Sequence, residues 1–177
     1  MAKKILLGLA AVLVIIQFFR PTKNISDEMS ASEISYHYAI PDSVALILDV
    51  ACNDCHSNNT KYPWYANVQP TAWWLNNHIV EGKRHLNFTT FTARPIARQN
   101  HMFEEIVETV KKGEMPLPSY TWLGLHSEAN LSDQQKQTLV NWAEAQMDSL
   151  KATYPPDSLI LRRPPGAPQG PPPGAGI

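Results

Sequence analysis

The stretch Cys52-Asn53-Asp54-Cys55-His56 is the most informative part of this chain. The two cysteines are three positions apart, so on a helix their thiols lie about one turn apart. At that spacing each thiol can bond to one of the two vinyl groups on a single edge of a haem. The histidine that follows can then place an imidazole nitrogen on the iron. This is the pattern by which c-type haem is attached covalently.

Two other chemistries also use paired cysteines. A thioredoxin-like redox pair stands near alternating strands and helices, and this sequence shows no such alternation. A zinc site needs a second pair of ligands, usually two more cysteines or two histidines a few residues apart. The chain has only these two cysteines, and His78 and His85 are separated by six residues. Zinc and redox chemistry stay open as alternatives, but the motif favours haem.

Length and charge limit the remaining function classes. A chain of 177 residues suits one domain with additional segments. Its formal net charge is -1 and the two signs are mixed, so there is no electrostatic case for binding nucleic acid. Both cysteines lie in the motif, so no structural disulfide is expected.

Residues 1–21 have the features of a membrane anchor or a signal sequence. Lys3 and Lys4 precede an apolar run, residues 5–19, that only Gln17 interrupts. A helix of this length is shorter than the hydrocarbon core of a bilayer, which is about 30 Å thick. No small-residue cleavage pattern follows the run. We therefore expect an uncleaved N-terminal membrane helix with a cytoplasmic N-terminus, and keep a cleaved signal as the alternative.

The remaining segments predict an all-α domain between two extended segments. The polar residues 22–40 are expected to be a tether, and the Pro/Gly-rich residues 154–177 a disordered tail. Between them, residues 41–153 show helical patterns and turn signals. The expected helices cover residues 44–50, begun by Asp42 or Ser43 as N-cap, then 71–82, 96–112 and the segment after Ser132, which forms a capping box with Gln135.

A second axial ligand for the iron is sought outside the motif. Gly113 ends the helix over residues 96–112, and Pro116 biases Met115 away from helical geometry. Met115 therefore lies in a loop that can present its thioether to a metal. His78 is the alternative distal ligand. It shares a predicted helical face with Trp74, Leu75 and Ile79, however, so packing against these residues accounts for a histidine at this position without iron. His101 and Met102 can also ligate iron, although a methionine in a helical stripe usually belongs to the core.

Several of these features together resemble a known family. The chain resembles the bacterial haem-binding domain proteins common in Bacteroidetes and, more broadly, monohaem class I cytochromes c. The resemblance covers roughly residues 40 to 150. It is carried by Cys52–Tyr65 (CNDCHSNNTKYPWY), Trp73-Trp74 with His78-Ile79, Leu86-Asn87-Phe88, and Met115-Pro116 with Pro118 and Tyr120.

The resemblance implies a small cytochrome c-like fold around a covalently attached haem c. It also implies a membrane-tethered or exported protein, with the haem domain on the periplasmic side of the bacterial cytoplasmic membrane. Cys52 and Cys55 would hold the haem as thioethers, His56 would be the proximal iron ligand and Met115 the distal one. His/Met ligation fills both axial positions, which suits electron transfer to a redox partner protein more than enzymatic catalysis.

Two other functions remain open. One is a peroxidase-like haem enzyme or a haem-based sensor, with an open or His-ligated distal site that involves His78 or His101. The other is a binding module whose tail and tryptophans serve a partner protein.

Overall fold

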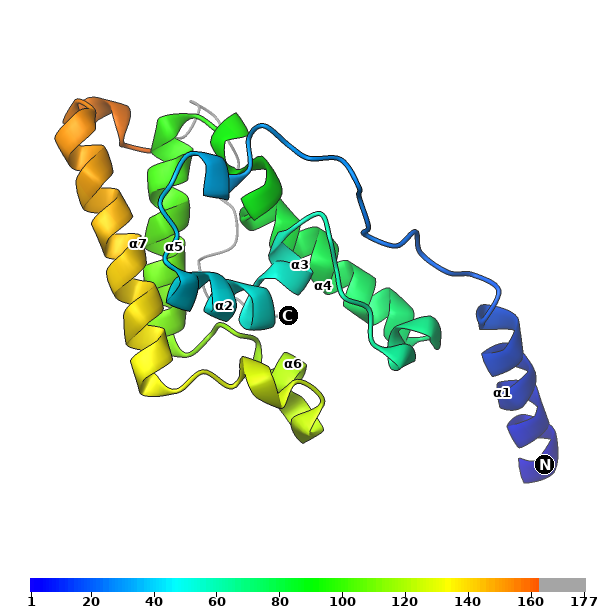
Figure 1. Ribbon diagram of the computed structural model, residues 1–177. Helices are drawn as coiled ribbons and strands as arrows, with labels where there is room; N and C mark the ends of the chain where they lie inside the picture. Colours follow the sequence, from blue (N-terminus) through cyan, green and yellow to red (C-terminus); the bar gives the residue numbers. More distant parts are fainter. Residues whose placement is uncertain (163–177) are drawn as a thin grey trace.

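The computed structural model describes residues 1–162, and all the regular structure in this part is helical (Figure 1). The prediction of an all-α fold is therefore confirmed. The longer helices are α1 (Ala2–Ile16), α2 (Asp42–Ala51), α4 (Thr71–His85), α5 (Ile96–Lys112) and α7 (Asp133–Thr153). The shorter helical segments are α3 (Asn53–His56), α6 (Pro118–Thr121), η1 (Ile34–Tyr36), η2 (Trp64–Asn67), η3 (Phe88–Ala93), η4 (Trp122–Gly124), η5 (Ser127–Ala129) and η6 (Pro156–Ser158).

The main core lies between α5 and α7, which run side by side, and the first turns of α2 (Figure 1). Apolar residues three and four positions apart give each helix one buried stripe. Phe103 is at the centre of this core, with its ring 5.0 Å from the ring of Phe91 and 5.6 Å from that of Trp142. On α5 this stripe includes Met102, whose place in the core the sequence predicted, together with Ile106 and Val110, and all three are buried.

Most helix ends lie where the sequence predicts them. Gly113 terminates α5 with a φ of 71°, which favours glycine. Ser132 caps α7, and the capping box with Gln135 is present. The predicted cap of α2 is wrong, because neither Asp42 nor Ser43 is the capping residue. Asp42 is already the first residue of the helix, and Pro41 precedes it.

The segment expected to be a tether is instead part of the domain from Asn24 onward. The backbone N–H of Asn24 donates to the Tyr62 hydroxyl at 2.7 Å, and its side-chain amide donates to Thr60 Oγ1 at 2.9 Å. Ile34 is buried in the main core, and the indole of Trp142 donates to the carbonyl of Ala39 at 2.9 Å. Hydrogen bonds and one buried side chain thus hold parts of this segment on the domain, while most of its residues stay exposed.

The two chain ends also differ from expectation. Helix α1 has 15 residues, and none of them is buried. Within residues 1–162, no helix combines the length and apolarity needed to cross a membrane, so the expected membrane-spanning helix is not found. At the other end, η6 is followed by Leu159, which is buried in the main core, while most of residues 154–162 are exposed. The rest of the predicted tail lies outside the described residues.

Candidate functional site

The cysteine-histidine motif lies between two hydrophobic clusters. Cys52 separates α2 from α3 and packs against the main core. Cys55 packs against a smaller cluster made by Ala66, Leu75 and Ile79. The backbone N–H of His56 donates to the carbonyl of Cys52 at 2.9 Å, so the motif forms one helical turn as predicted. The two thiols therefore lie beside two different hydrophobic clusters of the domain.

Both cysteines are free thiols, and both residues are half-buried. Burial raises the pKa of Cys52 to about 12 and the pKa of Cys55 to about 11. Redox-active cysteines show the opposite shift, because their thiolates are stabilised. Within residues 1–162, no group of three or more Cys, His, Asp or Glu side chains is arranged to hold a metal ion. The redox and zinc alternatives thus find no support in the site.

The imidazole of His56 is fixed by two backbone carbonyls. Its Nδ1 lies 3.0 Å from the oxygen of Leu86 and 3.1 Å from that of Gly82. A carbonyl oxygen can only accept, so Nδ1 carries the hydrogen and the lone pair lies on Nε2. Burial lowers the pKa of His56, which favours the neutral ring. This arrangement is the one that orients a metal-bound histidine, so His56 fits a haem iron.

Helix α4 approaches the motif closely at Gly82. A Cβ at this position would lie 2.9 Å from the backbone oxygen of Cys55 and 3.4 Å from Cε1 of His56. Real Cβ atoms essentially never come within 3.0 Å of another heavy atom. The missing side chain therefore allows α4 to support the motif directly and to bring its carbonyl to His56.

We expect Gly82→Ala to destabilise the protein, although alanine favours a helix by about 1 kcal/mol over glycine. The clash with the Cys55 backbone should cost about 1–3 kcal/mol and weaken the orientation of His56. Thermal unfolding and the haem spectrum should record both effects. Gly8→Ala is the matched control, because Gly8 lies in α1 with nothing within 4 Å of its Cβ position. A Gly82→Ala protein at least as stable as the wild type would contradict the close contact.

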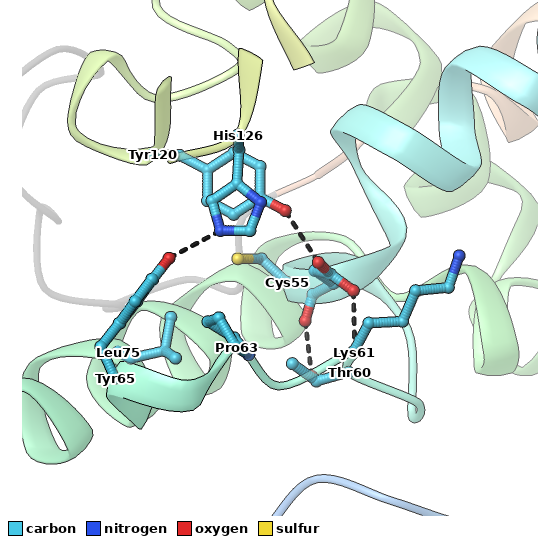
Figure 2. Close-up of a pocket in the computed structure, with 9 residues that line it drawn as sticks. Cys55, Thr60, Lys61, Pro63, Tyr65, Leu75, Tyr120 and His126 are labelled. Carbon is cyan, nitrogen blue, oxygen red and sulfur yellow. Dashed lines mark hydrogen bonds between the residues drawn. The ribbon is translucent and has the colours of Figure 1, made fainter. Parts of the chain in front are cut away.

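A small pocket lies beside Cys55, on the side of the loop that follows α5 (Figure 2). The rings of Tyr120 and His126 stack in it, with centroids 4.1 Å apart and planes 9° apart. His126 Nε2 lies 2.6 Å from the hydroxyl of Tyr65. In Figure 2 the Cys55 sulfur lies next to the stacked rings. The pocket thus brings a buried imidazole and two phenols to the haem attachment motif.

Asp54, between the two cysteines, connects two segments to the motif, the loop of Thr60 and Lys61 and the segment of Tyr120. Its carboxylate accepts from the Tyr120 hydroxyl at 2.7 Å and from the backbone N–H of Lys61 at 2.9 Å. Its carbonyl accepts from Thr60 Oγ1 at 2.6 Å. Burial, together with the hydrogen bond to Asp54, raises the pKa of Tyr120, so the phenol stays protonated. The loop that carries Tyr120 also carries Met115, so this contact holds that loop near the motif.

The structure places Met115 outside any helix, as predicted. Met115 follows Gly113, is half-buried and packs against the main core, as Cys52 does. No contact in the structure tests whether its sulfur binds iron, and its role as distal ligand stays a prediction.

The two histidines considered as alternatives lie elsewhere. The ring of His78 packs 4.4 Å from the ring of Trp74, so part of the predicted packing is present. Of the predicted face only Leu75 and Ile79 are buried, whereas Trp74 is 47% exposed. Position 78 lies about 60° around the helix from position 75 and about 100° from position 79, and Leu75 and Ile79 face the small cluster. His101 lies within 3.3 Å of carboxylate oxygens of Glu104 and Glu105.

The sequence did not single out His126 as a functional residue. It lies in a segment without helical periodicity, and its partner Tyr65 is 61 residues away along the chain. The one available signal was Tyr120, which stands in the Met115–Tyr120 part of the resemblance. His126 could be found only through the contact between two loops.

Comparison with known proteins points to a single family. A family model described as a haem-binding domain matches residues 11–145. No curated protein and no solved structure matches the chain. The matched range includes the motif, the His56 supports, Met115 and the pocket residues.

Proposed function

Because the chain belongs to the haem-binding domain family, and is thus a haem-binding protein, we propose that it is a monohaem c-type cytochrome that transfers electrons. The observation that carries this proposal is the helical turn of Cys52, Cys55 and His56, with the imidazole hydrogen of His56 held by two carbonyls. Cys52 and Cys55 would hold haem c as thioethers. His56 would be the proximal ligand and Met115 the distal one. The haem supplies reversible one-electron chemistry at iron.

The residues of the chain would position this group and keep water away from it. Hydrogen bonds from Nδ1 of His56 to the Gly82 and Leu86 carbonyls make the imidazole a better donor to iron. A thioether is a soft ligand that favours the reduced metal, so Met115 would raise the potential. The contact between Asp54 and Tyr120 would hold the Met115 loop in place. Both axial positions would then be filled, as suits a carrier.

Location and partner are part of the same proposal. Covalent haem is attached on the outer side of the bacterial cytoplasmic membrane, so the domain would be exported to the periplasm. The exposed apolar residues of α1, preceded by Lys3 and Lys4, would associate with lipid. The redox partner would be another protein that reaches the haem edge.

A second candidate function is a peroxidase-like enzyme or haem-based sensor. The observation that favours it is the Tyr65–His126 hydrogen bond of 2.6 Å, which places a buried base beside Cys55. In that case the sixth position of the iron would be open or held by a histidine.

An optical spectrum of the purified holoprotein separates the two functions. A carrier with Met115 on the iron should be low-spin in both states and show a sulfur-to-iron charge-transfer band in the oxidised state. A high-spin oxidised spectrum would overturn the carrier and favour the open site.

A further inference from the structure

A buried glutamine holds the C-terminal end of α1 against the domain. Gln69 is only 2% exposed. Its backbone N–H donates to Gln17 Oε1 at 3.0 Å, and its carbonyl accepts from Gln17 Nε2 at 3.2 Å. Its side-chain amide donates to the carbonyl of Phe19 at 2.7 Å, and the indole of Trp73 donates to the same oxygen at 2.8 Å. We call this set of contacts the Gln17–Gln69 clamp.

The clamp is a specific contact, because it pairs the amide groups of two glutamines. Gln17 is the single polar residue in the apolar run over residues 5–19. Burying an amide costs free energy unless its donors and acceptors are paired, and here the amides of both glutamines are paired. The direction of α1 is thereby fixed relative to α4, whose first turn carries Trp73.

Exposed aromatic side chains surround the clamp. Phe18, Phe19, Trp73 and Trp74 all expose large parts of their rings, and they continue the apolar surface of α1, which has no buried residue. Tryptophan with a hydrogen-bonded indole favours the boundary between lipid and water. Arg20 directly follows Phe19, and Lys23 stands three positions further on. Anionic headgroups would attract both side chains there.

We propose that the Gln17–Gln69 clamp seats the haem domain on a lipid surface in one fixed orientation. Helix α1 would enter the apolar layer, and Phe18, Phe19 and Trp73 would lie at the level of the headgroups. A helix of 15 residues is roughly 22 Å long, so it would enter the bilayer without crossing it. This inference rests on the lipid association proposed above and adds the orientation, the contact residues and the device that fixes them.

The rate of trypsin cleavage after Lys23 measures whether this part of the chain lies against the lipid surface. The full-length holoprotein would be mixed with vesicles of phosphatidylcholine and phosphatidylglycerol and recovered by flotation. Vesicles should slow cleavage after Lys23 at least about tenfold, while cleavage after Lys61, which is exposed on the motif loop, keeps its rate. A protein with both Gln17→Ala and Gln69→Ala loses the bonds from the Gln17 side chain to the Gln69 backbone and those of the Gln69 side chain. It should still float but regain fast cleavage after Lys23. Gln99→Ala is the matched control, because Gln99 is a buried glutamine remote from α1.

The outcomes separate this inference from the proposed location. Protein that does not float with vesicles would overturn the lipid association itself. Protein that floats, but shows equal cleavage after Lys23 with and without vesicles, would overturn the clamp orientation alone. Protection that appears without vesicles and rises with protein concentration would assign the surface to a second copy of the chain, and would also overturn the inference.

Discussion

A protein carrying both Cys52→Ala and Cys55→Ala is expected to lose all covalently bound haem when it is produced in a host that matures c-type cytochromes. The physical reason is that these two thiols are the only sulfur atoms of cysteine in the chain, so no other thioether can form. Wild-type protein should keep its haem through denaturation, and a haem stain on a denaturing gel should show the difference. The expected change is from full to undetectable staining.

Single variants supply the control for this prediction. Cys52→Ala or Cys55→Ala alone should keep one bond and hence some covalent haem, whereas the double variant keeps none. Removal of haem from the wild-type protein by acid–acetone would refute covalent attachment. The protein would then still bind haem as its family does, but in a non-covalent form.

The second large effect is expected from Met115→Ala. If Met115 closes the sixth position, its loss should abolish the sulfur-to-iron charge-transfer band and lower the reduction potential, because the soft thioether favours the reduced state. The opened iron should then bind carbon monoxide or imidazole, which the wild type should exclude. Titration of each ligand, followed by absorbance, measures the change.

Two variants separate ligation from packing. Met147→Ala is the matched control, because Met147 is also half-buried against the main core. Both methionine variants should lose about 1–3 kcal/mol of stability, but only Met115→Ala should alter the spectrum. His78→Ala should leave the spectrum unchanged, since His78 packs on an exposed tryptophan. A low-spin spectrum that survives Met115→Ala and disappears in His78→Ala would identify a bis-histidine cytochrome.

The parts of the fold that the sequence predicted well are those that local physics determines. The stripe on α5, its end at Gly113 and the capping box of α7 each depend on residues within a few positions of one another. Segment 22–40 was misread because its burial depends on distant partners. Asn24 bonds to Thr60, and Trp142 reaches Ala39 from 103 residues away.

The candidate site divides in the same way. The motif residues were recognisable because their spacing carries the chemistry. The support of His56 by Gly82 and Leu86, and the pocket formed by His126 and Tyr65, arise only when α4 and two loops meet. A single sequence gives no local signal for contacts between distant segments, so these residues could be found only in the folded chain.

The position of the motif between two clusters bears on how the protein unfolds. Cys52 packs against the main core and Cys55 against the small cluster of Ala66, Leu75 and Ile79. A haem bonded to both sulfurs would be a covalent bridge between these parts. Without that bridge the small cluster, with three buried apolar residues, would be held by the contacts of α4 with the motif. It would open before the main core, which amide hydrogen exchange in α4 would register. The cofactor would thereby make the two regions unfold together.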